Sequence, residues 1–389
     1  MNRSVRLLST LVVSDRSRGR PRAGLPALLL SLAMAALSGC TSTAQPAAGS
    51  SPASAAASAG SSGAPAGLPK LAPLSPAVKV KLAANPELLA YLPMLLALDK
   101  GYFSAAGLDV ELVPFRGGSS QVLSQLATGE VDFSGTTPSP GLYNAAAQGF
   151  GAKAVSVLSV PKEGRASDTW LTVVKDEATA IKNVQDLKGK TIEAATAGSI
   201  PDLLTWEAVT AAGLKPGVDA TITHRANTIA DLVSIAKAKG ADVVAINEPL
   251  ATQAEQQGII AKWKSYIDLM PWFQGVNFSV SKQFLAQHRD AVVQFVAVYI
   301  AASRLVDASN GEWTPDLLSE ATTRGNVSAD VIKAQGGVPY YLPDGLPTAD
   351  SLTRVQDVWL AQGLLKSKVD VSTMLDTSIA RDAAAKLGK

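Results

Sequence analysis

From residue 78 onward, strand-like and helix-like segments alternate along the chain, and this alternation is the feature that most limits its fold. Short apolar runs rich in Val, Ile and Leu are followed by turns containing Gly or Ser, and then by segments with helical spacing of apolar residues. Alternating strands and helices favour a mostly parallel sheet with helices on its faces. The sequence therefore predicts an α/β fold.

The alternation runs through two similar cycles. In the first cycle the predicted strands are 78–83, 108–113 and 131–134, and the predicted helices are 88–100 and 121–128. The second cycle begins after Trp170, with predicted strands at 171–174, 191–195, 221–223 and 241–246 and predicted helices at 183–187, 201–212 and 228–238. Two similar units in one chain indicate two Rossmann-like lobes with a cleft between them.

The last third of the chain adds one more strand, starting at Asn277, and then a series of helices. The predicted helices are 290–307, 314–322, 328–335, 349–362 and 379–386. These helices must pack somewhere, and a return to the first lobe would make both lobes compact. The chain would then cross between lobes twice, near 161–170 and 270–276, forming a two-segment hinge. The expected organisation is 77–168 with 277–389 as lobe 1, and 169–276 as lobe 2.

The N-terminal part of the chain has the pattern of a secretory signal. Four arginines between residues 16 and 22 precede an apolar run, 25–37, which leads into Leu37-Ser38-Gly39-Cys40. The apolar run is too short to favour a transmembrane helix. We therefore expect 1–39 to be a signal peptide, with Cys40, the only cysteine, as the first retained residue and the acceptor of a lipid.

The alternative interpretation of Cys40 is a buried free thiol, because lone cysteines usually pack as small hydrophobes. That interpretation requires a folded core around Cys40, whereas 41–66 consists almost entirely of Ser, Ala, Gly, Pro and Thr. Such a segment buries too little apolar surface to offset its ordering entropy. We expect 40–76 to be a lipidated, flexible linker that holds an exported protein at the extracytoplasmic face of a membrane, or in the periplasm.

Composition argues against several classes of function. Without the six arginines and one aspartate of 1–39, the chain carries 29 basic and 32 acidic side chains, a net charge of −3, which argues against nucleic acid as a partner. The two histidines, His224 and His288, have no partner at metal-ligand spacing. We therefore expect no metal and no cofactor.

A series of short motifs follows both cycles in a fixed order. In the first cycle they are 98–103 (LDKGYF), 107–112 (GLDVEL) and 126–132 (LATGEVD); in the second they are 186–190 (DLKGK), 198–199 (GS), 212–214 (AGL), 239–242 (KGAD) and 248–249 (EP). Singly, their glycines only end helices or make turns. Their combined order covers nearly all of 78–310 and resembles the solute-binding proteins for aliphatic sulfonates, nitrate, taurine and thiamine precursors.

This resemblance implies a type II periplasmic-binding-protein fold and a specific set of partners. Proteins of that group capture a small-molecule ligand and deliver it to an ABC permease with its ATPase, and we expect this chain to do so as a monomer. Some relatives with the fold are enzymes that use a nucleophilic cysteine or a site rich in cysteine and histidine. Because the only cysteine here belongs to the lipidation motif, we expect a binding protein and no enzyme.

Candidate ligand contacts lie in the loops after the strands, because ligands of open α/β sheets bind beyond the carboxyl ends of strands. The candidates are Asn85, Tyr91, Arg116, Gly117, Gly118, Ser119, Thr136, Thr137, Ser199, Arg225 and Glu248. Glycines and hydroxyl residues before helices favour an anion, because free backbone N–H groups and the positive end of the helix dipole meet there. The same hydroxyl residues also serve as ordinary N-caps, so either role, or both, fits them.

The charged candidates point to the class of ligand. Arg116 and Arg225 could hold a sulfonate or carboxylate through two parallel hydrogen bonds. Glu248 follows the strand 241–246 and matches the acidic position before proline in the family, where it would meet a cation or a hydrogen-bond donor. We expect a small organic anion, a sulfonate or taurine-like molecule. A pyrimidine thiamine precursor, nitrate or bicarbonate is the alternative.

The lipid anchor is directly testable. Cys40→Ala is expected to abolish incorporation of labelled fatty acid and to release the protein from the membrane fraction, because no second thiol can accept the diacylglyceryl group. Metabolic labelling with cell fractionation measures both effects. A Cys40→Ala protein that still carries lipid would contradict the expectation.

Overall fold

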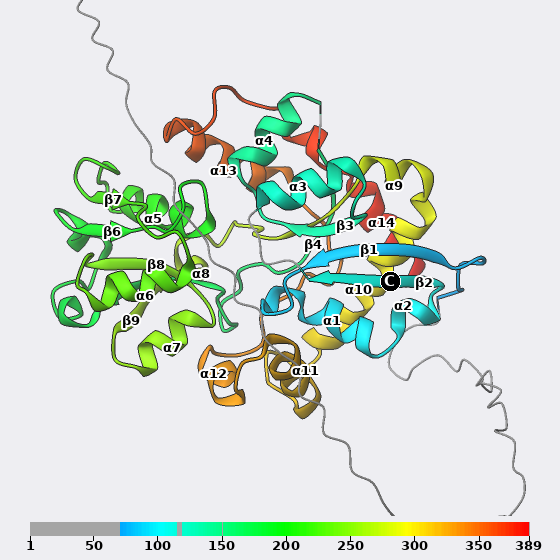
Figure 1. Cartoon of the computed structure of the whole chain (residues 1–389), viewed down its shortest axis with the longest axis horizontal. Helices are drawn as coiled ribbons and strands as arrows, with labels where there is room; N and C mark the ends of the chain where they lie inside the picture. Colours follow the sequence, from blue (N-terminus) through cyan, green and yellow to red (C-terminus); the bar gives the residue numbers. More distant parts are fainter. Residues whose placement is uncertain (1–70, 115–118, 150, 389) are drawn as a thin grey trace, which may run out of the picture. The chain divides into compact units, whose positions relative to one another are not determined.

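The computed structural model describes residues 71–114, 119–149 and 151–388, which all fall in one compact unit, Gly60–Lys389. Cys40 and the segment Arg116-Gly117-Gly118 lie outside the described residues. Two five-stranded sheets form the centres of two lobes (Figure 1). Within the described ranges, no helix combines the length and apolarity that a membrane crossing requires.

The first sheet has the strand order β2-β1-β3-β10-β4. Its strands are β1 (Val78–Ala84), β2 (Leu108–Pro114), β3 (Phe133–Thr136), β4 (Lys153–Val157) and β10 (Asn277–Val280). β1 pairs in parallel with β2 and β3, whereas β10 pairs antiparallel with both β3 and β4. Four strands therefore point one way, and β10 runs against them.

The second sheet repeats this arrangement with the order β7-β6-β8-β5-β9. Its strands are β5 (Thr169–Val174), β6 (Thr191–Glu193), β7 (Thr221–Thr223), β8 (Val243–Asn247) and β9 (Ile260–Ser265). Here β5 is the strand that runs against the other four. The prediction of an α/β fold with two mostly parallel, Rossmann-like lobes is confirmed.

The two antiparallel strands mark where the chain passes from one lobe to the other. β5 follows directly on the first crossing, 158–168, and β10 follows on the second crossing, 270–276. The two crossings touch, because the backbone N–H of Leu158 donates to the carbonyl of Val276 at 2.8 Å. The hinge therefore consists of two hydrogen-bonded segments, each of which leads straight into the interior of a sheet.

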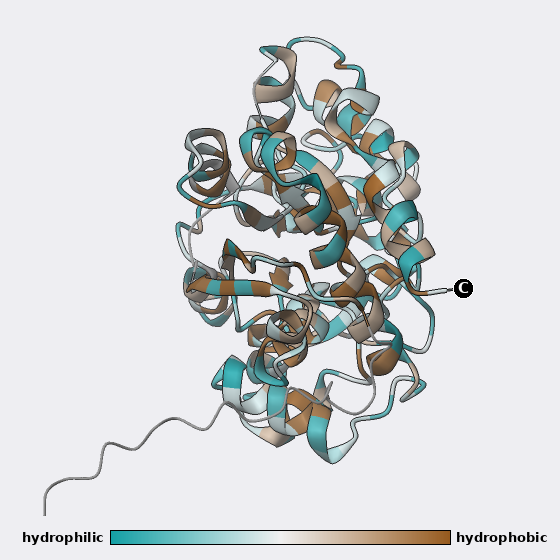
Figure 2. Ribbon diagram, turned by 90° about the vertical axis from the view of Figure 1, so that its right-hand side faces the viewer, coloured by the Kyte–Doolittle hydropathy of each residue, from teal (hydrophilic) through white to brown (hydrophobic). Residues whose placement is uncertain are grey.

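Helices cover both sheets. Around the first sheet lie α1 (Leu92–Asp99), α2 (Tyr102–Ala105), α3 (Ser119–Thr128), α4 (Pro140–Ala147), α9 (Lys282–Gln287), α10 (Arg289–Asp307) and α14 (Thr377–Lys386); around the second lie α5 (Ile200–Ala211), α6 (Ile229–Lys237), α7 (Leu250–Gln256) and α8 (Tyr266–Leu269). Apolar residues, brown in Figure 2, concentrate on the strands, while many helices carry both colours, as amphipathic helices do. In the first lobe, the ring of Phe295 from α10 stacks on Phe133 at 4.2 Å and on Phe103 at 4.8 Å between centroids.

Seven of these elements were not predicted from the sequence: α2, α4, β4, α7, α8, β9 and α9. The third strand of the first lobe also begins two residues later than predicted, at Phe133. Asp132, which precedes it, bonds to Lys81 of β1 through both its backbone N–H and its carboxylate. That carboxylate contact turns the chain into the strand.

One C-terminal helix packs against both lobes. The last part of the chain forms α11 (Pro315–Gly325), α12 (Ala329–Ala334) and α13 (Ala349–Ala361), in addition to α14. Trp359 of α13 is fully buried and meets the ring of Tyr143 from α4 edge-on at 5.5 Å. The same apolar cluster includes Leu171 of β5 and Leu203 of α5, so it extends from lobe 1 into lobe 2.

Trp359→Ala is expected to lower the free energy of unfolding by about 3–5 kcal/mol, because a large, fully buried side chain leaves a cavity. Thr353→Ala, on the exposed face of the same helix, is the matched control and should change it by less than about 0.5 kcal/mol. Urea denaturation measures both. Equal effects of the two substitutions would contradict the role of Trp359 as a core residue.

Candidate functional site

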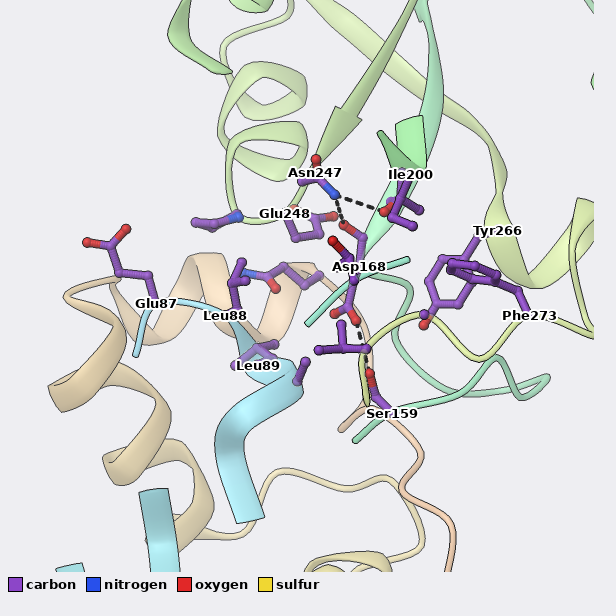
Figure 3. A pocket seen from close by; sticks show the side chains of 17 residues that line it. Glu87, Leu88, Leu89, Ser159, Asp168, Ile200, Asn247, Glu248, Tyr266 and Phe273 are labelled. Carbon is purple, nitrogen blue, oxygen red and sulfur yellow. Dashed lines mark hydrogen bonds between the residues drawn. The ribbon is translucent and has the colours of Figure 1, made fainter. Parts of the chain in front are cut away.

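A cavity of about 100 Å³ lies where the two lobes meet the two crossings (Figure 3). Lobe 1 contributes the turn before α1, the residue after β3 and the residue after α12. Lobe 2 contributes the start of β5, the end of β8 and the starts of α5 and α8, and both crossings contribute side chains. The lining residues are Glu87, Leu88, Leu89, Ala90, Thr137, Ser159, Asp168, Thr169, Ile200, Asn247, Glu248, Pro249, Tyr266, Phe273, Gly275, Val276 and Gln335.

The position of the cavity follows from the topology. Thr137 comes directly after the carboxyl end of β3, and Glu248 comes directly after the carboxyl end of β8. Parallel strands end at the same edge of a sheet, so side chains that follow them gather there. Residues that follow strands of both sheets line the same cavity, and residues of the two crossings that connect the sheets line it as well.

Asp168 ends the first crossing, immediately before β5. Its carboxylate accepts a hydrogen bond from the hydroxyl of Ser159 at 3.4 Å, and its backbone carbonyl accepts one from the N–H of Glu248 at 3.0 Å. The side chain of Asn247 also donates to that carbonyl, at 3.4 Å, and to the hydroxyl of Thr169 at 2.9 Å. Asp168 is therefore fixed between the crossing and the end of β8.

Burial raises the pKa of Asp168 from 3.8 to about 6, and the negative charge of Glu248 adds to the increase, while the Ser159 hydroxyl opposes it. Among the residues that the structure describes, no Lys, Arg or His side chain forms an ion pair with Asp168. The carboxyl group is thus held in a partly desolvated place without a compensating cation.

Glu248 has the opposite environment. Its carboxylate lies 2.8 Å from the ammonium of Lys262, and both side chains are at least nine-tenths buried. The carboxylate also accepts hydrogen bonds from the backbone N–H and the hydroxyl of Thr252, at 3.0 and 3.1 Å. The sequence analysis expected a cation on the ligand as the partner of Glu248, and in the structure the protein itself supplies one.

The other candidate residues from the sequence divide into two groups. Thr137 lines the cavity beside Glu248. Thr136 is buried beneath it and shares a hydrogen bond of 2.5 Å with Ser279. The hydroxyl of buried Tyr91 donates to the carbonyl of Gly135 at 3.3 Å, and the side chain of Asn85 accepts from the N–H of Glu87 at 3.0 Å. These last three do not line the cavity.

The candidates in lobe 2 are engaged in local structure. Ser199 caps α5 by accepting from the N–H of Asp202 at 3.4 Å. Arg225 donates to Glu193, whose side chain is fully buried, at 3.0 Å and to the carbonyl of Gly240 at 2.6 Å. In this arrangement neither lines the cavity, so ligand contacts of these two, as of Asn85, Tyr91 and Thr136, stay predictions.

The remaining candidates are less fully described. Ser119 begins α3, while Arg116, Gly117 and Gly118 lie outside the described residues. The sequence reasoning missed Asp168, Tyr266 and Phe273 altogether. The only signal that could have found Asp168 was its place in a predicted crossing, next to a predicted strand. Across the described ranges, no three His, Cys, Asp or Glu side chains are grouped to hold a metal ion.

Comparison with known proteins places the chain in a family. The family model described as "NMT1/THI5 like" matches residues 89–305, more than half of the chain. The chain belongs to the NMT1/THI5-like family. This stretch contains the turn before α1, both crossings and the whole second sheet, so the cavity of this family member lies almost entirely within the matched part.

Named relatives and solved structures agree with the fold. YtlA of Bacillus subtilis (strain 168), which is named as a binding protein, is 22% identical over 307 residues, 78% of this chain and 89% of that protein. The periplasmic aliphatic sulphonate-binding protein SsuA of Escherichia coli superposes with a TM-score of 0.62 at 21% identity, covering 76% of this chain and 91% of SsuA. The periplasmic nitrate-binding protein NrtA of Synechocystis PCC 6803 gives 0.64 at 15%, covering 80% and 89%. The family member therefore has the predicted type II periplasmic-binding-protein fold.

Lys262→Met is expected to destabilise the protein by about 3 kcal/mol, because it leaves the buried carboxylate of Glu248 without its cation. The double substitution Lys262→Met with Glu248→Gln should recover most of that loss, since no buried charge then remains. Lys239→Met, at a largely exposed lysine, is the control and should have little effect. Thermal or urea denaturation of the four proteins decides; a Lys262→Met loss no greater than that of the control would show that the pair is unimportant.

Proposed function

We propose that this protein captures a small solute outside the cytoplasm in the cavity at its hinge and delivers it to an ABC permease with its ATPase. The observation that supports this most directly is the position of the cavity. Its lining comes from both lobes and from both crossings, so a ligand there contacts every part that moves when the lobes move. The named relatives are binding proteins, and we propose binding without conversion of the solute.

The mechanism follows from the two-segment hinge. A ligand would bind first to one wall and would then be enclosed as the lobes rotate about 158–168 and 270–276. Closure is favoured only to the extent that the ligand binds the closed form better than the open form. The permease would recognise the closed form of a monomeric binding protein.

We further propose that the mature protein is held at the extracytoplasmic face by a lipid on Cys40. The support is the sequence pattern of 25–40 and the Ser-, Ala- and Gly-rich segment behind it. A flexible tether of this kind keeps the lobes near the permease and raises their effective concentration there without any added contact.

The cavity also bears on the choice of ligand. Among its described lining residues, Asp168 has a carboxyl group with which no described Lys, Arg or His forms an ion pair, whereas the charge of Glu248 is balanced by Lys262. Among the expected ligands, those that carry a hydrogen-bond-donating nitrogen fit this lining best. We therefore place a taurine-like amino-sulfonate first, with an aminopyrimidine thiamine precursor as the alternative, ahead of a plain alkyl sulfonate, nitrate or bicarbonate.

Lobe closure can be followed by energy transfer between two dyes. Cysteines replacing Val218 in lobe 2 and Leu305 in lobe 1, both exposed, can be labelled in a Cys40→Ala background. Transfer efficiency is expected to change when a screened sulfonate, amino-sulfonate, pyrimidine, nitrate or bicarbonate binds. A pair within lobe 2, at Val218 and Gln256, should not respond. Closure would be contradicted if every compound that raises the melting temperature left the transfer efficiency unchanged.

A further inference from the structure

Asp168 is a charged group at the cavity whose counter-ion the described protein does not supply. Its carboxylate is partly buried, and among the described side chains Ser159 alone donates to it, through a long bond of 3.4 Å. In Figure 3 the carboxyl group of Asp168 points toward Ser159, to which a dashed line joins it. A buried carboxylate normally has a cation or several short hydrogen bonds, and the described residues give this one neither.

The groups that face Asp168 do not compensate its charge. Glu248 comes from the end of β8 and is negative, although its own charge is balanced by Lys262. Tyr266 of α8 and Tyr341, which follows α12, are phenols whose pKa is raised by burial and then by the charge of Asp168, so both stay neutral. None of these neighbouring groups supplies a positive charge to balance Asp168. Its side chain is therefore either a negatively charged carboxylate or a neutral carboxylic acid.

The rest of the cavity is mainly apolar. Leu88 and Leu89 from lobe 1, Ile200 from lobe 2, and Phe273 and Val276 from the second crossing form its walls. Ligand pockets commonly combine apolar walls with a few polar groups that fix the orientation of the ligand. Asp168 is placed to be such a group, at the base of the cavity and on the hinge itself.

We propose that Asp168 recognises the ligand by accepting hydrogen bonds from a protonated nitrogen, so that the solute is a small organic cation or a zwitterion with an apolar body. This inference rests on the proposed function, because it assigns the ligand of the same cavity. A protonated nitrogen would supply the missing counter-ion and form a charge-assisted hydrogen bond in a water-poor place. Its source is either an alkylamine, as in taurine, or an aminopyrimidine.

Ligand binding at Asp168 would also act on the hinge. The backbone carbonyl of Asp168 already accepts from Glu248 and Asn247 of lobe 2, and its carboxylate accepts from Ser159 of the crossing. A cation held at this point contacts the base about which the lobes rotate. The same contact that selects the ligand would therefore favour the closed form.

The direction of proton exchange gives a test that needs no variant. With a pKa of about 6, the empty site is about half protonated at pH 6. A cation bound beside Asp168 lowers that pKa, so binding at pH 6 releases protons, whereas a bound anion would raise the pKa and take protons up. Calorimetry of the full chain in buffers with different ionisation enthalpies measures the number of protons and its sign.

Four probes separate the contributions of the ligand. Taurine carries amine and sulfonate, ethanesulfonate lacks the amine, ethylamine lacks the sulfonate, and 4-amino-5-hydroxymethyl-2-methylpyrimidine offers an aromatic donor edge. We expect taurine or the pyrimidine to bind at least about tenfold more tightly than ethanesulfonate, with proton release on binding of an amine. Whichever of the two binds identifies the source of the nitrogen.

A matched pair of substitutions locates the effect. Asp168→Asn keeps the size of the side chain and removes the charge, and it should weaken the amine-bearing ligand about tenfold and abolish the proton release. Asp330→Asn, at an exposed aspartate on α12, should leave affinity and proton release unchanged. If Asp168→Asn does not fold, the proton measurement on the unaltered chain still decides.

Three results would overturn the inference: proton uptake on binding of an amine, unchanged affinity in folded Asp168→Asn, or ethanesulfonate binding as tightly as taurine. In each of these cases the cavity would still bind a solute, and the proposed function would stand. Failure of all four probes at millimolar concentration also counts against the inference. The proposed function fails separately, if no compound of the wider energy-transfer screen produces closure.

Discussion

The hydrogen bond from Leu158 to Val276 joins the two segments on which both lobes depend. Each segment enters the opposite sheet as its antiparallel fourth strand, so the hinge is continuous with the most buried part of each lobe. A displacement of either crossing is therefore transmitted to β5 or β10 rather than absorbed in a surface loop. The cavity lies on this base because the parallel strands of both sheets end above it.

The order of elements could be predicted because each depends on local pattern, whereas the site depends on contacts between distant residues. Periodicity indicated β1, β8 and α10, and the repetition of the strand and helix pattern indicated the two lobes. Periodicity did not indicate α4, because its short, Ala-rich sequence shows little helical spacing of apolar residues. The ligand contact of Arg225 stays a prediction, and its ion pair with Glu193, 32 residues away in a short strand, was not foreseen because no local pattern reports that pairing. Asp168 was missed for the same reason: its burial is set by β8 and both crossings.

Two acidic residues a few ångströms from one cavity show how strongly environment determines the role of a side chain. Glu248 has a buried ammonium and two bonds from Thr252, so its charge is part of the stable framework of lobe 2. Within the described part of the chain, the carboxylate of Asp168 accepts one long bond, from Ser159, and burial makes its ionised form costly. Burial and the nearby partners therefore separate the two carboxylates into one that the protein itself pairs with a cation and one that, as proposed above, recognises the ligand.

Helix α13 connects the two lobes through side-chain packing, in addition to the two chain crossings. Its Trp359 packs on Tyr143 from one lobe within a cluster that also holds Leu203 from the other, so separating the lobes must slide or break that packing. The work needed to open the protein is thus partly set far from the ligand. Because apparent affinity scales with the population of the competent form, variation at this helix would tune how tightly a solute is held while leaving its identity unchanged.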